Sequence, residues 1–108
     1  MRYLMSVINS GAAQASPDEE LRIDAFNEKM QAAGQRIVAH GLYEPELAKS
    51  IDARTEDVTI VDGLINPTEE FMIGFWIVEV DSHDNAMQLA LEGSRACNRK
   101  IELRQIHG

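Results

Sequence analysis

Residues 71–80, near the centre of the chain, constrain the fold more than any other stretch. Their sequence is FMIGFWIVEV, and the first eight positions carry no polar side chain. Successive side chains of a β-strand point to opposite faces, so this run places apolar groups on both faces. A strand with one face exposed to solvent alternates apolar and polar residues instead. We therefore expect residues 71–80 to form a central strand that is covered on both sides.

The composition is typical of one globular domain. At 108 residues, with 44% hydrophobic and 26% charged side chains, residues 1–108 are expected to form a single domain with a real core. No apolar run approaches the ~20 residues of a membrane span, so no membrane partner is expected. The first residues are strand-like and do not resemble a signal peptide, which makes a cytoplasmic location the expectation.

Charge and cysteine usage narrow the classes of partner. Ten Lys and Arg against eighteen Asp and Glu give a net charge of −8, which disfavours nucleic acid as a partner because phosphates would be repelled. Cys97 is the only cysteine, so no intrachain disulfide or thiolate metal cluster can form. It is interpreted as a half-buried helix residue, with a reactive thiol as the alternative.

Helix caps and hydrophobic periodicity predict the element order. Ser16 followed by Pro17 and Glu19 is typical of a helix start, and an apolar stripe of Ile23, Phe26, Met30 and Ala33 follows it. The same capping pattern recurs at Asn66-Pro67-Thr68-Glu69 and predicts a short helical turn there. The expected elements are a strand at 2–9, a helix from 17 to about 33, a strand at 36–42, a hairpin at 47–61, a strand at 71–80, a helix at 83–97 and a strand at 100–107.

This order predicts an α+β fold of the ferredoxin-like βαββαβ type with an inserted β-hairpin. In that plan the first and third main strands are central, and these are the two segments that are apolar on both faces, 2–9 and 71–80. Two helices cover only one face of the sheet. A second copy of the same sheet is an economical cover for the other face, so a homodimer is expected.

The chain resembles the YCII-related proteins, in particular their DGPF-type branch. The resemblance rests on Asp62-Gly63-Leu64-Ile65, where the family shows Asp-Gly-Pro-Phe, on Asn66–Glu70, on the strand Gly74–Asp81, on the opening Met1–Met5, and on the glycines at 34 and 41. The resemblance implies a dimeric α+β barrel in which two sheets enclose a cleft.

The family also includes proteins thought to be enzymes that use a histidine in the first helix with an aspartate nearby. This chain has no histidine between Pro17 and Ala33, and Phe26 lies roughly where that histidine would fall. The catalytic histidine is therefore not carried over from the resemblance.

Four residues are the candidates for a small-molecule site. We expect His40 and Asp62 to line a pocket with Arg54 as a polar neighbour and Trp76 as an aromatic wall. His40 could instead be a partly exposed side chain, or act as an acid or base. Asp62 also has a structural explanation, because Asp-Gly is a turn dipeptide.

Sequence motifs for other chemistries are absent. There is no His-x-His or Cys-x-x-Cys pair, and His40 and Glu44 are separated by Gly41 and followed by Pro45, which deny them a shared helix face. Neither a dinucleotide nor a P-loop glycine pattern occurs, nor a Gly-x-Ser-x-Gly elbow. No metal and no cofactor are expected.

The sequence is compatible with three functions. The first is a homodimeric barrel of uncharacterised function that binds a small molecule in the cleft between its sheets or acts in regulation. The second is a cofactor-free enzyme of the isomerase, lyase or dehalogenase type that transfers protons through His40 or a carboxylate. The third is a pure interaction module. A titratable pair in a closed cleft would favour the enzyme, and a barrel without a cavity would favour the interaction module.

Overall fold

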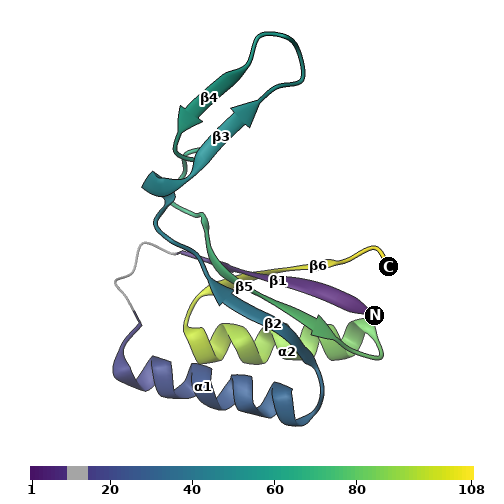
Figure 1. The fold of residues 1–108 in the computed structure, drawn as a ribbon. Coiled ribbons are helices and arrows are strands. Elements are labelled where there is room, and N and C mark those ends of the chain that lie inside the picture. The colour runs from purple at the N-terminus through teal and green to yellow at the C-terminus, as the bar shows by residue number, and fades with distance from the viewer. Residues whose placement is uncertain (10–14) are drawn as a thin grey trace.

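A computed structural model describes residues 1–9 and 15–108 and shows the predicted α+β fold. Two helices lie against one face of an antiparallel sheet, and a two-stranded hairpin projects from its far side (Figure 1). The elements are β1 (Arg2–Ile8), α1 (Pro17–Ala32), β2 (Arg36–Gly41), the short 3₁₀ helix η1 (Pro45–Leu47), β3 (Lys49–Asp52), β4 (Thr59–Asp62), β5 (Met72–Glu79), α2 (His83–Cys97) and β6 (Lys100–Gln105).

The main sheet has the strand order β2-β5-β1-β6, with every neighbouring pair antiparallel. This is the ferredoxin-like arrangement, and β5 and β1 are its central strands, as their two apolar faces predict. None of the helices among the described residues is long and apolar enough to cross a membrane.

The core lies between the sheet and the two helices. Register places Tyr3 opposite Val78 and Met5 opposite Trp76, so that these side chains share the face covered by the helices. Met30 of α1 is fully buried against them. The buried apolar residues are Tyr3, Met5, Val7, Phe26, Met30, Trp76, Val78, Val80, Ala86, Leu89, Ala96 and Cys97.

Capping residues hold the ends of both helices, and Ser16 does so as predicted. The Ser16 hydroxyl accepts the Glu19 N–H at 3.2 Å, and Ser82 accepts the Asn85 N–H at 3.1 Å. At the end of α2, Asn98 adopts the left-handed conformation with φ 52°.

The other face of the sheet, which we call the open face, has no helix over it (Figure 1). Cross-strand pairs place Leu4 opposite Ile77 and Ser6 opposite Phe75, and on β2 His40 lies opposite Phe75. Leu4, Phe75 and Ile77 are only half-buried because no layer covers them. The predicted need for cover on this side is thus unmet within one chain.

Two local predictions are wrong. Residues 66–69 form no helical turn, since Thr68 donates its hydroxyl proton to the Glu70 carbonyl at 2.7 Å and closes a local turn instead. The second wrong prediction concerns Ala33, which is exposed and not part of the core stripe because α1 ends at Ala32.

A 3₁₀ turn forms at Pro45–Leu47, between β2 and β3.

The predicted hairpin is present as β3 and β4, and we call residues 49–62 the arm. Ile51 pairs with Ile60, and Lys49 forms an ion pair with its partner Asp62. The base of the arm is held by the Gly63 N–H, which donates to the Ala48 carbonyl at 2.8 Å. The arm forms a separate two-stranded sheet and pairs with no strand of the main sheet.

Candidate functional site

A cavity of about 610 Å³ opens where β2 and β5 meet the middle of α1 and the end of α2; we call it the β2–β5 cavity. Most of its wall is apolar. Polar groups enter the wall from several elements, including Asn27 of α1, His40 of β2 and Arg99 after α2. The apolar wall is formed mainly by Val7, Ile23, Ala39, Leu42, Phe71, Ile73, Phe75 and Trp76.

Two glycines face each other in the wall of this cavity. Gly41 of β2 pairs with Gly74 of β5, so neither strand places a side chain in this part of the wall. A Cβ on Gly74 would lie 2.9 Å from the His40 carbonyl oxygen, closer than real Cβ contacts allow. Gly74 therefore permits the close approach of the two strands beside the cavity.

Trp76 is held in the cavity wall by α1. Its indole N–H donates to Asn27 Oδ1 at 2.9 Å, and the same oxygen accepts Arg36 Nη1–H at 3.2 Å. Phe26 packs edge-on against the indole, with ring centroids 5.3 Å apart. These contacts satisfy the one polar group of a buried tryptophan and fix the ring on the helix side of the sheet.

His40 lies at the rim of the cavity with an exposed side chain. Its ring packs at 60° to that of Phe75, with centroids 6.0 Å apart. In residues 1–9 and 15–108 no hydrogen bond or ion pair joins His40 to a carboxylate. The arrangement suits contact with an aromatic or hydrogen-bonding ligand group better than proton relay.

Arg99 is a cavity residue that sequence reasoning did not identify. It is buried beside α1, where Nη1 lies 3.5 Å from Glu19 Oε2 and donates to the Asn98 carbonyl at 2.9 Å. The sequence places it in a basic helix end, and only the packing of α1 against α2 turns it inward.

Cys97 also lines the cavity. Burial raises the pKa of its thiol above the usual 9.0. The protonated, buried thiol agrees with the interpretation of Cys97 as a packing residue.

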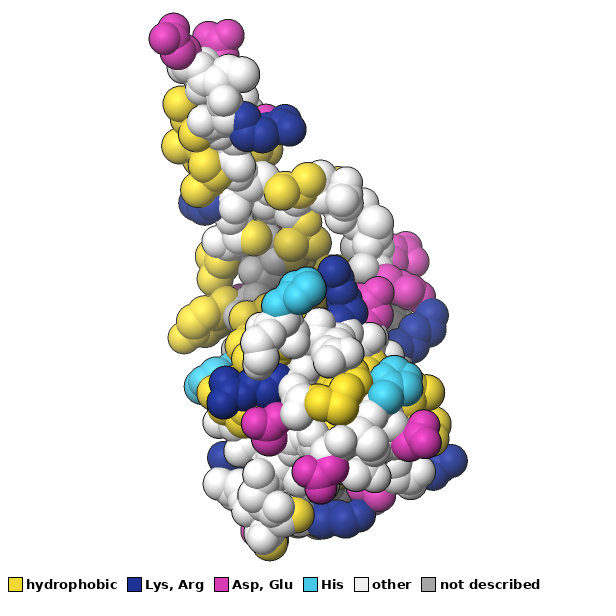
Figure 2. All heavy atoms as spheres, turned by 90° about the vertical axis from the view of Figure 1, so that its right-hand side faces the viewer, with side chains coloured by type: hydrophobic (Ala, Val, Ile, Leu, Met, Phe, Trp, Pro, Cys, Tyr) yellow, Lys and Arg dark blue, Asp and Glu magenta, His cyan; other side chains and the backbone are white. Residues whose placement is uncertain are grey.

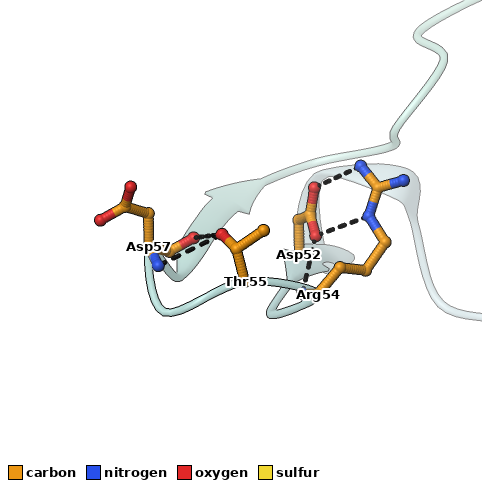
Figure 3. A network of polar contacts seen from close by, with 4 residues as sticks. All are labelled: Asp52, Arg54, Thr55 and Asp57. Carbon is orange, nitrogen blue, oxygen red and sulfur yellow. Dashed lines mark hydrogen bonds and ion pairs between the residues drawn. The ribbon is translucent and has the colours of Figure 1, made fainter.

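The other two predicted site residues lie on the arm. Asp62 forms an ion pair with Lys49. Arg54 forms a bidentate ion pair with Asp52, with N–O distances of 2.9 and 2.7 Å (Figure 3). The Arg54 guanidinium lowers the pKa of Asp52, which in turn raises the pKa of Arg54. The structure thus brings His40 and Trp76 to one cavity and leaves Asp62 and Arg54 outside it.

A second cavity of about 430 Å³ lies on the arm, with Arg54, Thr59 and Val61 in its wall. Among the described residues, no three His, Cys, Asp or Glu side chains gather in a way that could hold a metal ion.

Comparison with known proteins finds a distant likeness of fold. No family model matches the chain, and no curated protein matches it. All of the chain aligns with 96% of 5-chloro-2-hydroxyhydroquinone dehydrochlorinase from Burkholderia phenoliruptrix AC1100, solved with 2,5-dihydroxybenzoquinone, at 18% identity and a TM-score of 0.45. Nothing about the activity of this chain follows from so distant a likeness.

Proposed function

We propose that this protein binds a small, mainly apolar molecule in the β2–β5 cavity and does so as a homodimer. The observation that carries the proposal is the cavity itself. Its volume of about 610 Å³ falls within the roughly 300–1,000 Å³ typical of ligand pockets, and its wall is apolar with a few polar groups.

The polar groups define what the ligand would carry. Asn27 is already engaged with Trp76 and Arg36. The wall also includes His40, Tyr43 and Glu44, whose polar groups can meet a polar group of the ligand. A small apolar body with one polar group near His40 fits these walls.

Binding is better supported than proton-transfer catalysis. A titratable pair within hydrogen-bond reach inside a closed cleft would favour proton transfer by His40. His40 makes no such contact with a carboxylate among the described residues. The binding proposal needs only the shape and lining of the cavity.

Three features support the homodimer. The open face carries half-buried Leu4, Phe75 and Ile77 without cover. The chain exposes 7734 Å², roughly 1,700 Å² more than a compact monomer of this mass, whereas a standard interface takes about 800 Å² from each partner. The resemblance to DGPF-type proteins implies the same packing of sheets.

The binding proposal can be tested with N-phenyl-1-naphthylamine, a neutral apolar fluorophore. Trp76 is the only tryptophan and lines the cavity, so probe bound there should quench Trp76 emission by energy transfer. We expect saturable quenching with one site per chain.

Matched variants locate the probe. Ala39→Leu adds bulk to the cavity wall and should abolish saturable quenching, whereas Ala25→Leu, on an exposed face of α1, should leave it unchanged. His40→Ala should weaken binding, and Asp62→Ala should not, because Asp62 lies on the arm. Quenching that is unsaturable, or equal in Ala39→Leu and wild type with both folded by circular dichroism, contradicts the proposal.

A further inference from the structure

We propose that the arm packs on the second copy of this chain, with the face formed by Ile51, Val58 and Ile60 as its contact surface. The inference rests on the homodimer proposed above and adds to it a second region of contact. We call these three side chains the arm face.

The arm face exposes large apolar side chains together. Ile51 and Ile60 are cross-strand partners that point to one side of the hairpin, and they are 63% and 64% exposed. Val58 lies two residues before Ile60, so in an extended chain its side chain points to the same side as that of Ile60. Val58 is 59% exposed. Figure 2 shows hydrophobic side chains gathered along the arm below its acidic tip. An isolated two-stranded hairpin is marginally stable in water, so a surface of this kind requires cover.

The chain's own core does not provide that cover. The arm stands away from the sheet and helices (Figure 1), and the molecule measures 48 × 35 × 17 Å. Its radius of gyration is 15.8 Å, against about 13 Å for a compact domain of this length. Within one chain the arm is held by contacts at its base, such as the Ser50 hydroxyl that donates to the Gly63 carbonyl at 2.7 Å.

Position and charge favour a second copy as the occupant. The arm projects on the side of the sheet opposite to the helices, which is also the side of the open face (Figure 1). A chain stacked on the open face would therefore lie beside the arm. The tip carries Glu56 and Asp57. On the open face β6 carries Lys100 and Arg104 with Glu102 between them, and Lys100 pairs with Glu70 of the same chain, so Arg104 is the cation that a neighbouring copy offers to the acidic tip.

A pair of neighbouring substitutions on β4 tests the arm. Ile60→Glu puts a carboxylate on the arm face, and Thr59→Glu puts the same group on the opposite side of the same strand. By sedimentation equilibrium we expect Ile60→Glu to raise the dimer dissociation constant at least ~30-fold, as loss of a hot-spot contact would, and Thr59→Glu to change it less than ~3-fold. Circular dichroism should show that both variants keep the fold, because Ile60 is outside the core.

The outcomes separate this inference from the dimer itself. If the wild type is dimeric and Ile60→Glu has the same dissociation constant, the arm contact is overturned and the homodimer is not. A monomeric wild type overturns both. Hydrogen exchange provides an independent measurement: arm amides, including that of Ile60, should become more protected as protein concentration rises through the dissociation constant. Protection that does not depend on concentration overturns the arm contact. Neither result depends on ligand binding in the β2–β5 cavity.

Discussion

At the scale of single residues, the backbone approach at Gly74 and the contacts of Glu79 have consequences that can be measured. Gly74 sits where two strands come so close that a methyl group has no room. Glu79 sits at the far end of the same strand, where its carboxylate meets the chain terminus. One is a steric constraint and the other an electrostatic one.

Gly74→Ala should destabilise the protein by about 1–3 kcal/mol, because the new Cβ would lie 2.9 Å from the backbone oxygen of His40 and the strands would have to shift. Gly41→Ala is the matched control: its Cβ would meet only the Ile73 oxygen at 4.0 Å, an ordinary contact. Urea unfolding of both variants measures the difference. Equal stabilities would contradict the close approach.

Glu79 makes stability depend on pH. Its Oε2 accepts a hydrogen bond from the Met1 ammonium at 2.8 Å, with Arg2 3.7 Å from the other oxygen, and the ammonium chiefly lowers the pKa of Glu79 below 4.5. A pKa lowered by folding stabilises the protein above the unfolded value, and this stabilisation is lost as pH falls through the folded value. Glu79→Gln should therefore lower the melting temperature at neutral pH.

The difference in melting temperature between Glu79→Gln and wild type should shrink as pH falls below 4.5. Glu28→Gln, at an exposed position on α1, controls for the loss of one negative charge. A difference that stays constant from neutral to acid pH would show that the ion pair contributes no stability.

At the scale of elements, the polar contact of Asn27 joins α1 to two strands. Its Oδ1 accepts from Trp76 of β5 and from Arg36 of β2, and its Nδ2 donates to the Ile23 carbonyl at 3.0 Å. Apolar packing of Phe26 and Met30 holds α1 on the sheet, and Asn27 sets where along the sheet it lies.

Asn27→Ala should cost about 1–3 kcal/mol of unfolding free energy, because it leaves the buried indole N–H without its acceptor. Trp76 fluorescence should change at the same time, since the environment of the indole changes. Glu28→Ala, at the adjacent exposed position, should change neither property. A variant with normal stability and normal emission would show that water replaces the Asn27 oxygen without loss.

At the scale of the whole molecule, the central strand β5 separates folding from association. Trp76 points to the helices and is 5% exposed, whereas Phe75 points to the open face and is half-buried. Adjacent residues of one strand therefore serve two different interfaces.

Trp76→Ala should destabilise the chain by about 3–5 kcal/mol through lost burial, as observed for large aromatic residues in cores. Phe75→Ala should mainly shift the protein from dimer to monomer, because its ring lies on the proposed interface. Light scattering at micromolar concentration and thermal unfolding measure the two effects. A dimer that survives Phe75→Ala with unchanged affinity would contradict association through the open face.

Local patterns were enough to predict the order of elements. Ser16 acts on the backbone within a turn, so the start of the first helix could be predicted from neighbouring residues. The apolar run at 71–80 was enough to predict a central strand for the same reason: alternation is a property of the strand itself. The prediction of a helical turn at 66–69 was wrong because the Thr68 hydroxyl donates a hydrogen bond to the Glu70 carbonyl, and this bond closes a local turn in place of a helix.

What only the tertiary structure decided is which surfaces meet. Alternation defines two faces of residues 71–80 but does not say that Trp76 meets the helices and Phe75 does not. Arg99 joins the cavity because α1 packs over the end of α2, and Asp62 and Arg54 stay apart from His40 because the hairpin that carries them projects outward. By itself, then, the sequence determined the elements and their order through short-range sterics and hydrogen bonding, whereas the composition of the site depends on contacts between residues far apart in the chain, which no local pattern encodes.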